Sequence, residues 1–181
     1  MNNFFWLLAC LAPALAQSPD LSLDRWVDRT DTELATLLHA KCMASIEDHR
    51  PILIEFSASW CADCRQTAVL VTEPAMVTEL ASWHHVTINV GRLDRHMALA
   101  GRLGLDALGF WVATSPTTCV SEIEAWPILR KSSFEPVTGD DKHLTSESLA
   151  QWLFEARSPS NPSTRSKEKT PSSPPGSPTS P

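Results

Sequence analysis

The chain has 181 residues, of which 43% are hydrophobic and 20% charged, and its formal net charge is −6. This length accommodates one domain with accessory segments, or two very small domains. The acidic balance argues against a nucleic-acid-binding protein, because neutralising phosphates requires a basic face.

Residues 1–16 predict a secretory signal peptide. They form a short apolar stretch that ends in Ala-Leu-Ala, a small-x-small cleavage signal before Gln17. The stretch is too short to span a bilayer comfortably, so we expect an exported protein, in the periplasm or a similar compartment, that is soluble after cleavage. An alternative takes Cys10 as the lipidated cysteine of a lipoprotein, in which case the protein reaches a membrane only through that anchor.

The other end of the chain, residues 158–181, predicts a disordered tail. It is rich in proline and serine, and it contains nothing apolar that a core would bury. The remaining segment, 17–157, has a suitable length for one domain with a single core.

The first half of this domain alternates between helical and strand patterns. Thr30 and the glutamate three residues later form a candidate capping box, which predicts a helix to about residue 45. Residues 52–56 are a short apolar run of the kind found in a central strand with both faces covered. Two helical stretches follow, at 61–71 and 75–82, with a proline between them.

The next elements predict a parallel strand pair. Residues 85–90 form a strand candidate, and 94–103 form a helix candidate that a glycine ends. A strand, a helix and a second strand in this order require a parallel pair with a right-handed crossover. Residues 105–126 have a poor pattern, which we interpret as a long loop or insertion.

The last part of the domain predicts a hairpin and a helix. Residues 128–131 and 134–137 are two short strand candidates, and Gly139 breaks the second. Residues 145–156 form an amphipathic helix pattern. The complete order predicts an α/β fold, a mixed central sheet with helices on both faces, which by itself is compatible with many functions.

A Cys-x-x-Cys pair, Cys61 and Cys64, follows the first predicted strand at the start of a helix. A helix N-terminus stabilises a thiolate, so Cys61 can attack a disulfide and Cys64 can resolve the mixed disulfide. Asp63 lies between the two cysteines, and its negative charge destabilises a nearby thiolate by like-charge repulsion. Zinc sites share this spacing but need two further ligands at recognisable spacing, and an inert structural pair is the third reading.

The run Phe-Ser-Ala-Ser-Trp-Cys-Ala-Asp-Cys at 56–64 resembles the active-site segment of the thioredoxin superfamily. It is particularly similar to the exported thioredoxin-like domains of thiol-disulfide interchange proteins. The resemblance implies a thioredoxin-like fold and a protein-disulfide oxidoreductase, with Cys61 as the nucleophile and Cys64 as the resolving thiol. It implies no metal or organic cofactor beyond the redox-active disulfide itself.

Five further residues take roles from this resemblance. Glu55 stands where the family has a buried acid that accepts the resolving cysteine's proton. Pro127 stands where the family has a cis-proline beside the dithiol and just before a strand, and Pro116 competes for that place. Trp60 and Trp126, which precede Cys61 and Pro127, are the expected side chains of the substrate groove.

The other cysteines and two histidines leave alternatives open. Cys42 and Cys119 form a structural disulfide if the compartment is oxidising, or Cys42 is a small buried residue of the first helix. His84 and His85 complete a copper or zinc site with the dithiol, or they are ordinary residues at the start of a strand.

These patterns predict an exported thiol-disulfide oxidoreductase that acts on protein disulfides and exchanges electrons with an upstream thiol redox partner. The direction of electron flow stays open. A copper-carrying chaperone on the same fold and a non-catalytic interaction module are the alternative functions.

Overall fold

The computed structural model describes residues 25–119, 122–134 and 144–158. Their helices and strands, in chain order, are α1 (Asp31–Asp48), β1 (Ile52–Ser57), α2 (Ala62–Leu70), α3 (Pro74–Leu80), β2 (His84–Asn89), α4 (Met97–Leu103), β3 (Phe110–Thr114), the short 3-10 helix η1 (Ile123–Ala125), β4 (Ile128–Ser133) and α5 (Ser146–Arg157). Within these ranges no helix is both long and apolar enough to cross a membrane. The predicted signal peptide, Gly139 and residues 159–181 of the predicted tail lie outside the described residues.

The four described strands form one mixed sheet in the order β2-β1-β3-β4. β1 pairs with β2 in parallel and with β3 in antiparallel, and β3 pairs with β4 in antiparallel. The parallel pairing of β1 with β2 confirms the parallel pair that the sequence predicted. The chain passes through α2 and α3 between the two strands.

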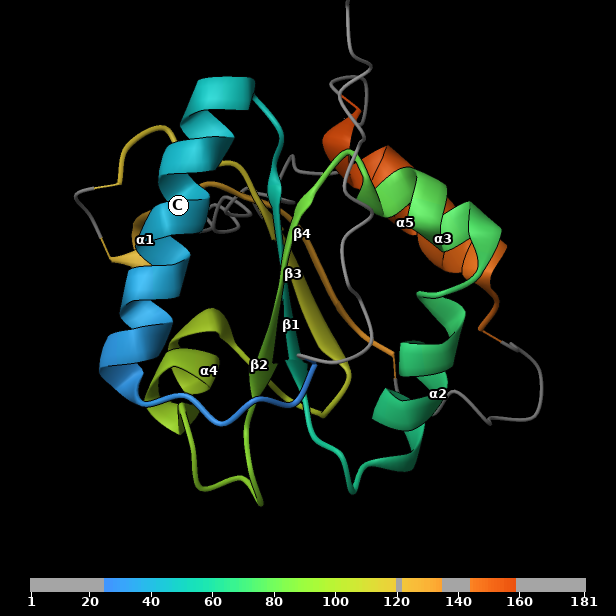
Figure 1. Ribbon diagram of the computed structural model, residues 1–181, viewed down its shortest axis with the longest axis horizontal. Coiled ribbons are helices and arrows are strands. Elements are labelled where there is room, and N and C mark those ends of the chain that lie inside the picture. Colours follow the sequence, from blue (N-terminus) through green and yellow to red (C-terminus); the bar gives the residue numbers. More distant parts are fainter. Residues whose placement is uncertain (1–24, 120–121, 135–143, 159–181) are drawn as a thin grey trace, which may run out of the picture.

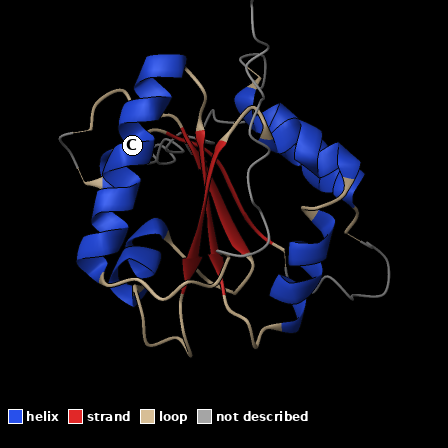
Figure 2. Cartoon of the chain, viewed as in Figure 1, coloured by secondary structure: helices blue, strands red, loops and turns tan. Residues whose placement is uncertain are grey.

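Helices cover both faces of this sheet, as the sequence predicted. Figure 1 shows α1 and α4 on one side of the sheet and α2, α3 and α5 on the other, and Figure 2 shows the resulting three layers. β1 is buried along its whole length. Its Ile54 belongs to the same hydrophobic core as Leu38 of α1. Leu53 belongs to the second core, together with Leu149 of α5. The alternation of side chains along one strand thus builds two cores.

The interpretation of residues 105–126 as a loop or insertion is wrong. They contain β3, a central strand whose five residues are all buried, and also η1. The run Phe-Trp-Val-Ala-Thr lacks the apolar-polar alternation of a half-buried strand because both of its faces are covered.

The predicted hairpin of 128–131 with 134–137 is also wrong. The strand β4 runs to Ser133 and pairs with β3. Phe134 follows β4 outside any strand, and its backbone N–H donates to the carbonyl of Gly109 at 3.2 Å. Residues 135–137 lie outside the described residues.

The helices begin and end at the local signals of the sequence. The predicted capping box is formed, since Thr30 Oγ1 accepts the backbone N–H of Glu33 at 3.2 Å and Glu33 Oε2 accepts that of Thr30 at 2.7 Å. Pro74 is the first residue of α3, where its missing N–H removes no helical hydrogen bond. Gly104 ends α4 with a φ of 84°, a backbone conformation that favours glycine.

Candidate active site

The two cysteines of the Cys-x-x-Cys pair lie at the N-terminus of α2. Cys61 is the N-cap residue, with extended backbone, and its Sγ accepts the backbone N–H of Cys64 at 3.1 Å. The two residues form a disulfide, with their Cα atoms 5.2 Å apart. When this disulfide is reduced, the N–H groups and the partial positive charge of the helix N-terminus stabilise a thiolate on Cys61.

The two sulfurs differ in accessibility. Cys61 is 5% exposed, and Cys64 is completely buried. Cys61 is therefore the more accessible of the two sulfurs. This difference is compatible with the roles that the sequence predicted, Cys61 as the nucleophile and Cys64 as the resolving thiol.

Trp60 is the exposed aromatic side chain beside the dithiol. It is 47% exposed, and its Nε1–H donates to the carbonyl of Gly91 at 2.5 Å, in the loop that follows β2. This hydrogen bond ties the segment before Cys61 to the end of the neighbouring strand. The indole thus lies at the surface next to the dithiol, where a substrate chain can contact it.

Glu55 is a fully buried carboxylate on β1. One of its oxygens, Oε1, pairs with Arg25 Nη2, and the other, Oε2, lies 3.1 Å from His85 Nε2. Burial by itself raises the pKa of Glu55, but the charge of Arg25 and the hydrogen bond from His85 outweigh it and lower the net pKa. A carboxylate with a lowered pKa is a weaker base, so these contacts favour charge pairing over the predicted proton-accepting role.

The partners of Glu55 were missed by the sequence reasoning. Arg25 precedes the first recognisable helix signal, and no motif connects it with Glu55. His85 is paired in register with Leu53, two residues from Glu55 on the same face of β1. The register of β1 and β2, which follows from the tertiary structure, was the missing information.

The lowered pKa of Glu55 predicts a specific acid sensitivity. Its contribution to stability is present above the pKa of an unfolded glutamate, about 4.3, and is lost as the pH falls through the folded value. Glu55→Gln is therefore expected to flatten the decrease in the free energy of unfolding below about pH 4, measured by denaturant titration at several pH values. Glu47→Gln, at an exposed position of α1, is the control. Equal slopes for Glu55→Gln and the wild type would contradict the prediction.

The assignment of Pro127 as the proline beside the dithiol is wrong. β3 begins at the dithiol end of β1, where Phe110 pairs with Phe56. It ends at the opposite end, where Thr114 pairs with Ile52 and, on its other side, with Ile128. Pro127 directly precedes Ile128 and therefore lies at the far end of the sheet from Cys61. The competitor Pro116, two residues after β3, follows that same far end.

A glycine stands where the resemblance placed a proline. Gly109 directly precedes β3 at the dithiol end, and its φ of 71° is a conformation that favours glycine. Its backbone N–H, which a proline would lack, is retained. A sequence signal existed, because Gly109 directly precedes the Phe-Trp-Val-Ala-Thr run, but recognising it required that run to be identified as a strand.

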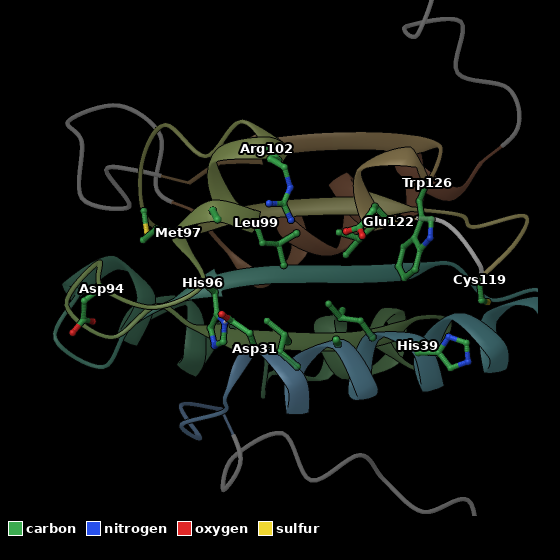
Figure 3. A pocket seen from close by; sticks show the side chains of 15 residues that line it. Asp31, His39, Asp94, His96, Met97, Leu99, Arg102, Cys119, Glu122 and Trp126 are labelled. Carbon is green, nitrogen blue, oxygen red and sulfur yellow. The ribbon is translucent and has the colours of Figure 1, made fainter.

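Trp126 is not beside the dithiol either, since it precedes Pro127. It is buried, and its side chain lines a groove of about 760 Å³ between α1 and the layer formed by α4 and η1. In Figure 3 Trp126 lies at the end of this groove opposite to His96 and Asp94. The prediction of Trp126 as a substrate contact beside Cys61 is therefore wrong.

The remaining two cysteines are joined. Cys42 of α1 and Cys119, five residues after β3, form a disulfide with their Cα atoms 5.8 Å apart. Cys42 is also fully buried in the core under α1, so the two readings of the sequence apply together. This disulfide attaches the segment after β3 to the first helix.

The two adjacent histidines point to opposite faces of β2. His84 Nε2 lies 2.9 Å from Asp48 Oδ1 on the α1 side, and His85 contacts Glu55 on the other. Neither contact involves the dithiol. Among the described residues no group of three histidine, cysteine, aspartate or glutamate side chains is arranged to hold a metal ion.

Of three comparisons with known proteins, only the one with solved structures finds a similarity. The chain matches no protein-family model and no curated protein. Solved structures with a similar backbone include a disulphide isomerase from Xylella fastidiosa Temecula1, with 18% sequence identity and a TM-score of 0.53 over 66% of this chain and 88% of that one. The C-terminal domain of DsbD from Neisseria meningitidis, in its reduced form, has 18% identity and a TM-score of 0.50 over 68% and 96%. With its mixed sheet, its two helical layers and the dithiol at the start of α2, the chain has a thioredoxin-like α/β fold.

Proposed function

We propose that this protein is an exported thiol-disulfide oxidoreductase that acts on protein disulfides. The observation that carries the proposal is the position of Cys61 as N-cap of α2, with its Sγ accepting the N–H of Cys64. The backbone N–H of Cys64, which Cys61 Sγ caps, also stabilises the thiolate that the reaction needs.

The reaction proceeds by two thiol-disulfide exchanges. In the reduced protein, the Cys61 thiolate attacks one sulfur of a substrate disulfide, forms a mixed disulfide and releases the other substrate sulfur as a thiolate. Cys64, as its thiolate, then attacks Cys61 Sγ and releases the second substrate sulfur. The substrate gains two electrons and two protons, and the protein is left with the Cys61–Cys64 disulfide. A thiol redox partner returns it to the dithiol, and each step runs in reverse when the protein acts as the oxidant.

Export is part of the proposal. The Cys42–Cys119 disulfide supports it, because structural disulfides persist in secreted and periplasmic proteins and are rare in reducing compartments. The apolar stretch 1–16 supports it as a candidate signal peptide. Cleavage before Gln17 yields a soluble protein, whereas modification of Cys10 yields a lipoprotein, and the mass of the mature protein distinguishes the two.

The experiment that tests the redox function is an equilibrium titration of the dithiol in glutathione buffers, with the free thiols trapped by alkylation. The proposal expects one reversible two-electron couple. A potential near about −270 mV identifies a reductant of the thioredoxin type, and one near about −120 mV identifies an oxidant that introduces disulfides. The absence of a reversible couple at every glutathione ratio would refute the oxidoreductase.

A further inference from the structure

Three polar side chains form a buried cluster on the face of the sheet that α2, α3 and α5 cover. Arg25 is 4% exposed at its side chain, Glu55 is 0% and His85 is 10%. Leu53 belongs to the same core as Leu149 of α5, and Glu55, two residues later on the same strand, faces the same side. Both carboxylate oxygens of Glu55 are occupied, one by Arg25 and one by His85.

The cluster contains one fixed positive charge and one negative charge that balance each other. Arginine stays protonated at every physiological pH, and Glu55 stays ionised because Arg25 pairs with it. Because the pair is buried, solvent and salt screen it weakly. Removing one partner would leave an uncompensated charge inside the protein.

This pair lies at the end of the sheet from which the dithiol departs. Ser57 is the last residue of β1, and the carbonyl of Ala58 accepts the backbone N–H of Cys61 at 3.2 Å. Trp26, the neighbour of Arg25, donates its Nε1–H to Ser57 Oγ at 3.0 Å. The segment that carries Arg25 is therefore attached to the strand end that leads into Cys61.

A second set of contacts attaches the same segment to the end of β2. Asn89 Nδ2 donates to the carbonyl of Trp26 at 2.9 Å and to Asp28 Oδ1 at 2.8 Å, and Asp28 pairs with Arg95. These contacts hold Arg25 in place although it belongs to no helix or strand. Its charge is thus positioned by the segment before α1, far from the dithiol in the sequence.

We propose that Arg25 is a positioning residue of the redox centre, and that its pairing with Glu55 keeps a buried positive charge from stabilising the Cys61 thiolate. This inference rests on the proposed redox function and deepens it. A more stable thiolate makes a dithiol more oxidising, so the balanced pair holds the protein toward the reducing end. Glu55 then acts as the counter-charge of Arg25, in place of the proton-accepting role that the family resemblance implied.

The test is a set of substitutions that separates the effect of the Arg25 charge from the effect of replacing the Glu55 side chain. Glu55→Gln leaves Arg25 unpaired, and we expect the Cys61 thiolate to become about tenfold more stable, the order of magnitude of one uncompensated charge acting within a protein at an effective dielectric of about 20. The same shift is expected when Arg25→Lys is added, because the positive charge remains. Adding Arg25→Met to Glu55→Gln removes the charge, and the thiolate stability is expected to return to within about threefold of the wild-type value.

Two readouts follow this shift. The pH profile of alkylation of the reduced protein reports the ionisation of Cys61, and the glutathione equilibrium reports the corresponding change in oxidising strength. Arg29→Met, in the same segment, is the control for loss of a positive charge and is expected to change neither readout.

The outcomes separate the inference from the function on which it rests. If the wild type has a reversible couple but Glu55→Gln shifts it equally with and without Arg25→Met, the role of Arg25 is refuted and the redox function stands. Arg25→Met/Glu55→Gln removes both charges of the buried pair, so it is measurable even if Glu55→Gln alone does not fold. A tenfold departure of this double variant from the wild type would by itself overturn the inference. A wild type without any couple refutes the function, and the inference with it.

Discussion

Replacing Cys61 by serine is expected to reduce disulfide exchange to the uncatalysed rate, a loss of roughly a thousandfold or more. A serine hydroxyl at the N-cap still accepts the N–H of residue 64 and preserves α2. It stays protonated at neutral pH, however, and it cannot form a disulfide. The measurement is the initial rate of reduction of a protein disulfide by the purified protein in the presence of a thiol reductant.

Cys64→Ser gives a different expected result, which serves as the matched control. The nucleophile at Cys61 is retained, but the internal attack that releases the substrate is lost, so the mixed disulfide accumulates. Non-reducing electrophoresis and intact mass are expected to detect a covalent complex with Cys64→Ser and none with Cys61→Ser. Complexes formed through Cys64 in the Cys61→Ser variant would contradict the assignment of the two roles.

Removing the Cys42–Cys119 disulfide is expected to cause the largest loss of stability among these substitutions. The two cysteines are 77 residues apart in sequence. In the chain-entropy model, opening a loop of that length increases the conformational entropy of the unfolded chain and lowers the free energy of unfolding by about 4.5 kcal/mol. Denaturant unfolding of Cys42→Ser/Cys119→Ser, compared with the wild type under non-reducing conditions, measures this loss.

The active-site disulfide supplies the control for that experiment. Cys61 and Cys64 are only 3 residues apart, and the same relation predicts a smaller loss of about 1.5 kcal/mol for Cys61→Ser/Cys64→Ser. This variant also isolates the second disulfide chemically. Two alkylatable thiols in the folded, unreduced Cys61→Ser/Cys64→Ser protein would show that Cys42 and Cys119 are not bridged.

Several features of this protein were predictable because they depend on residues close together in the chain. The N-cap position of Cys61 and its hydrogen bond from Cys64 follow from a three-residue spacing at the start of a helix. The capping box at Thr30 and the end of α4 at Gly104 are equally local. The parallel pairing of β1 with β2 was also predictable, because the connection through two helices allows little else.

The arrangement around the dithiol was decided by contacts between distant segments. β3 occupies the place beside β1 that makes Gly109, rather than Pro127, the residue preceding a strand at the dithiol end. A fully covered strand lacks the apolar-polar alternation that identifies a half-buried one, and without that alternation residues 110–114 were interpreted as part of a loop.

By itself the sequence determined the chemistry of this protein, a thiol pair at a helix N-terminus in an α/β chain. Only the tertiary structure decided the electrostatic surroundings of that pair. Glu55 could be located from its spacing to Cys61, but the cation that neutralises it comes from Arg25, before the first helix, and its second partner, His85, comes from another strand. Burial strengthens such charge pairs, and the register of the strands selects the partners. The spacing of neighbouring residues in the sequence encodes neither of these.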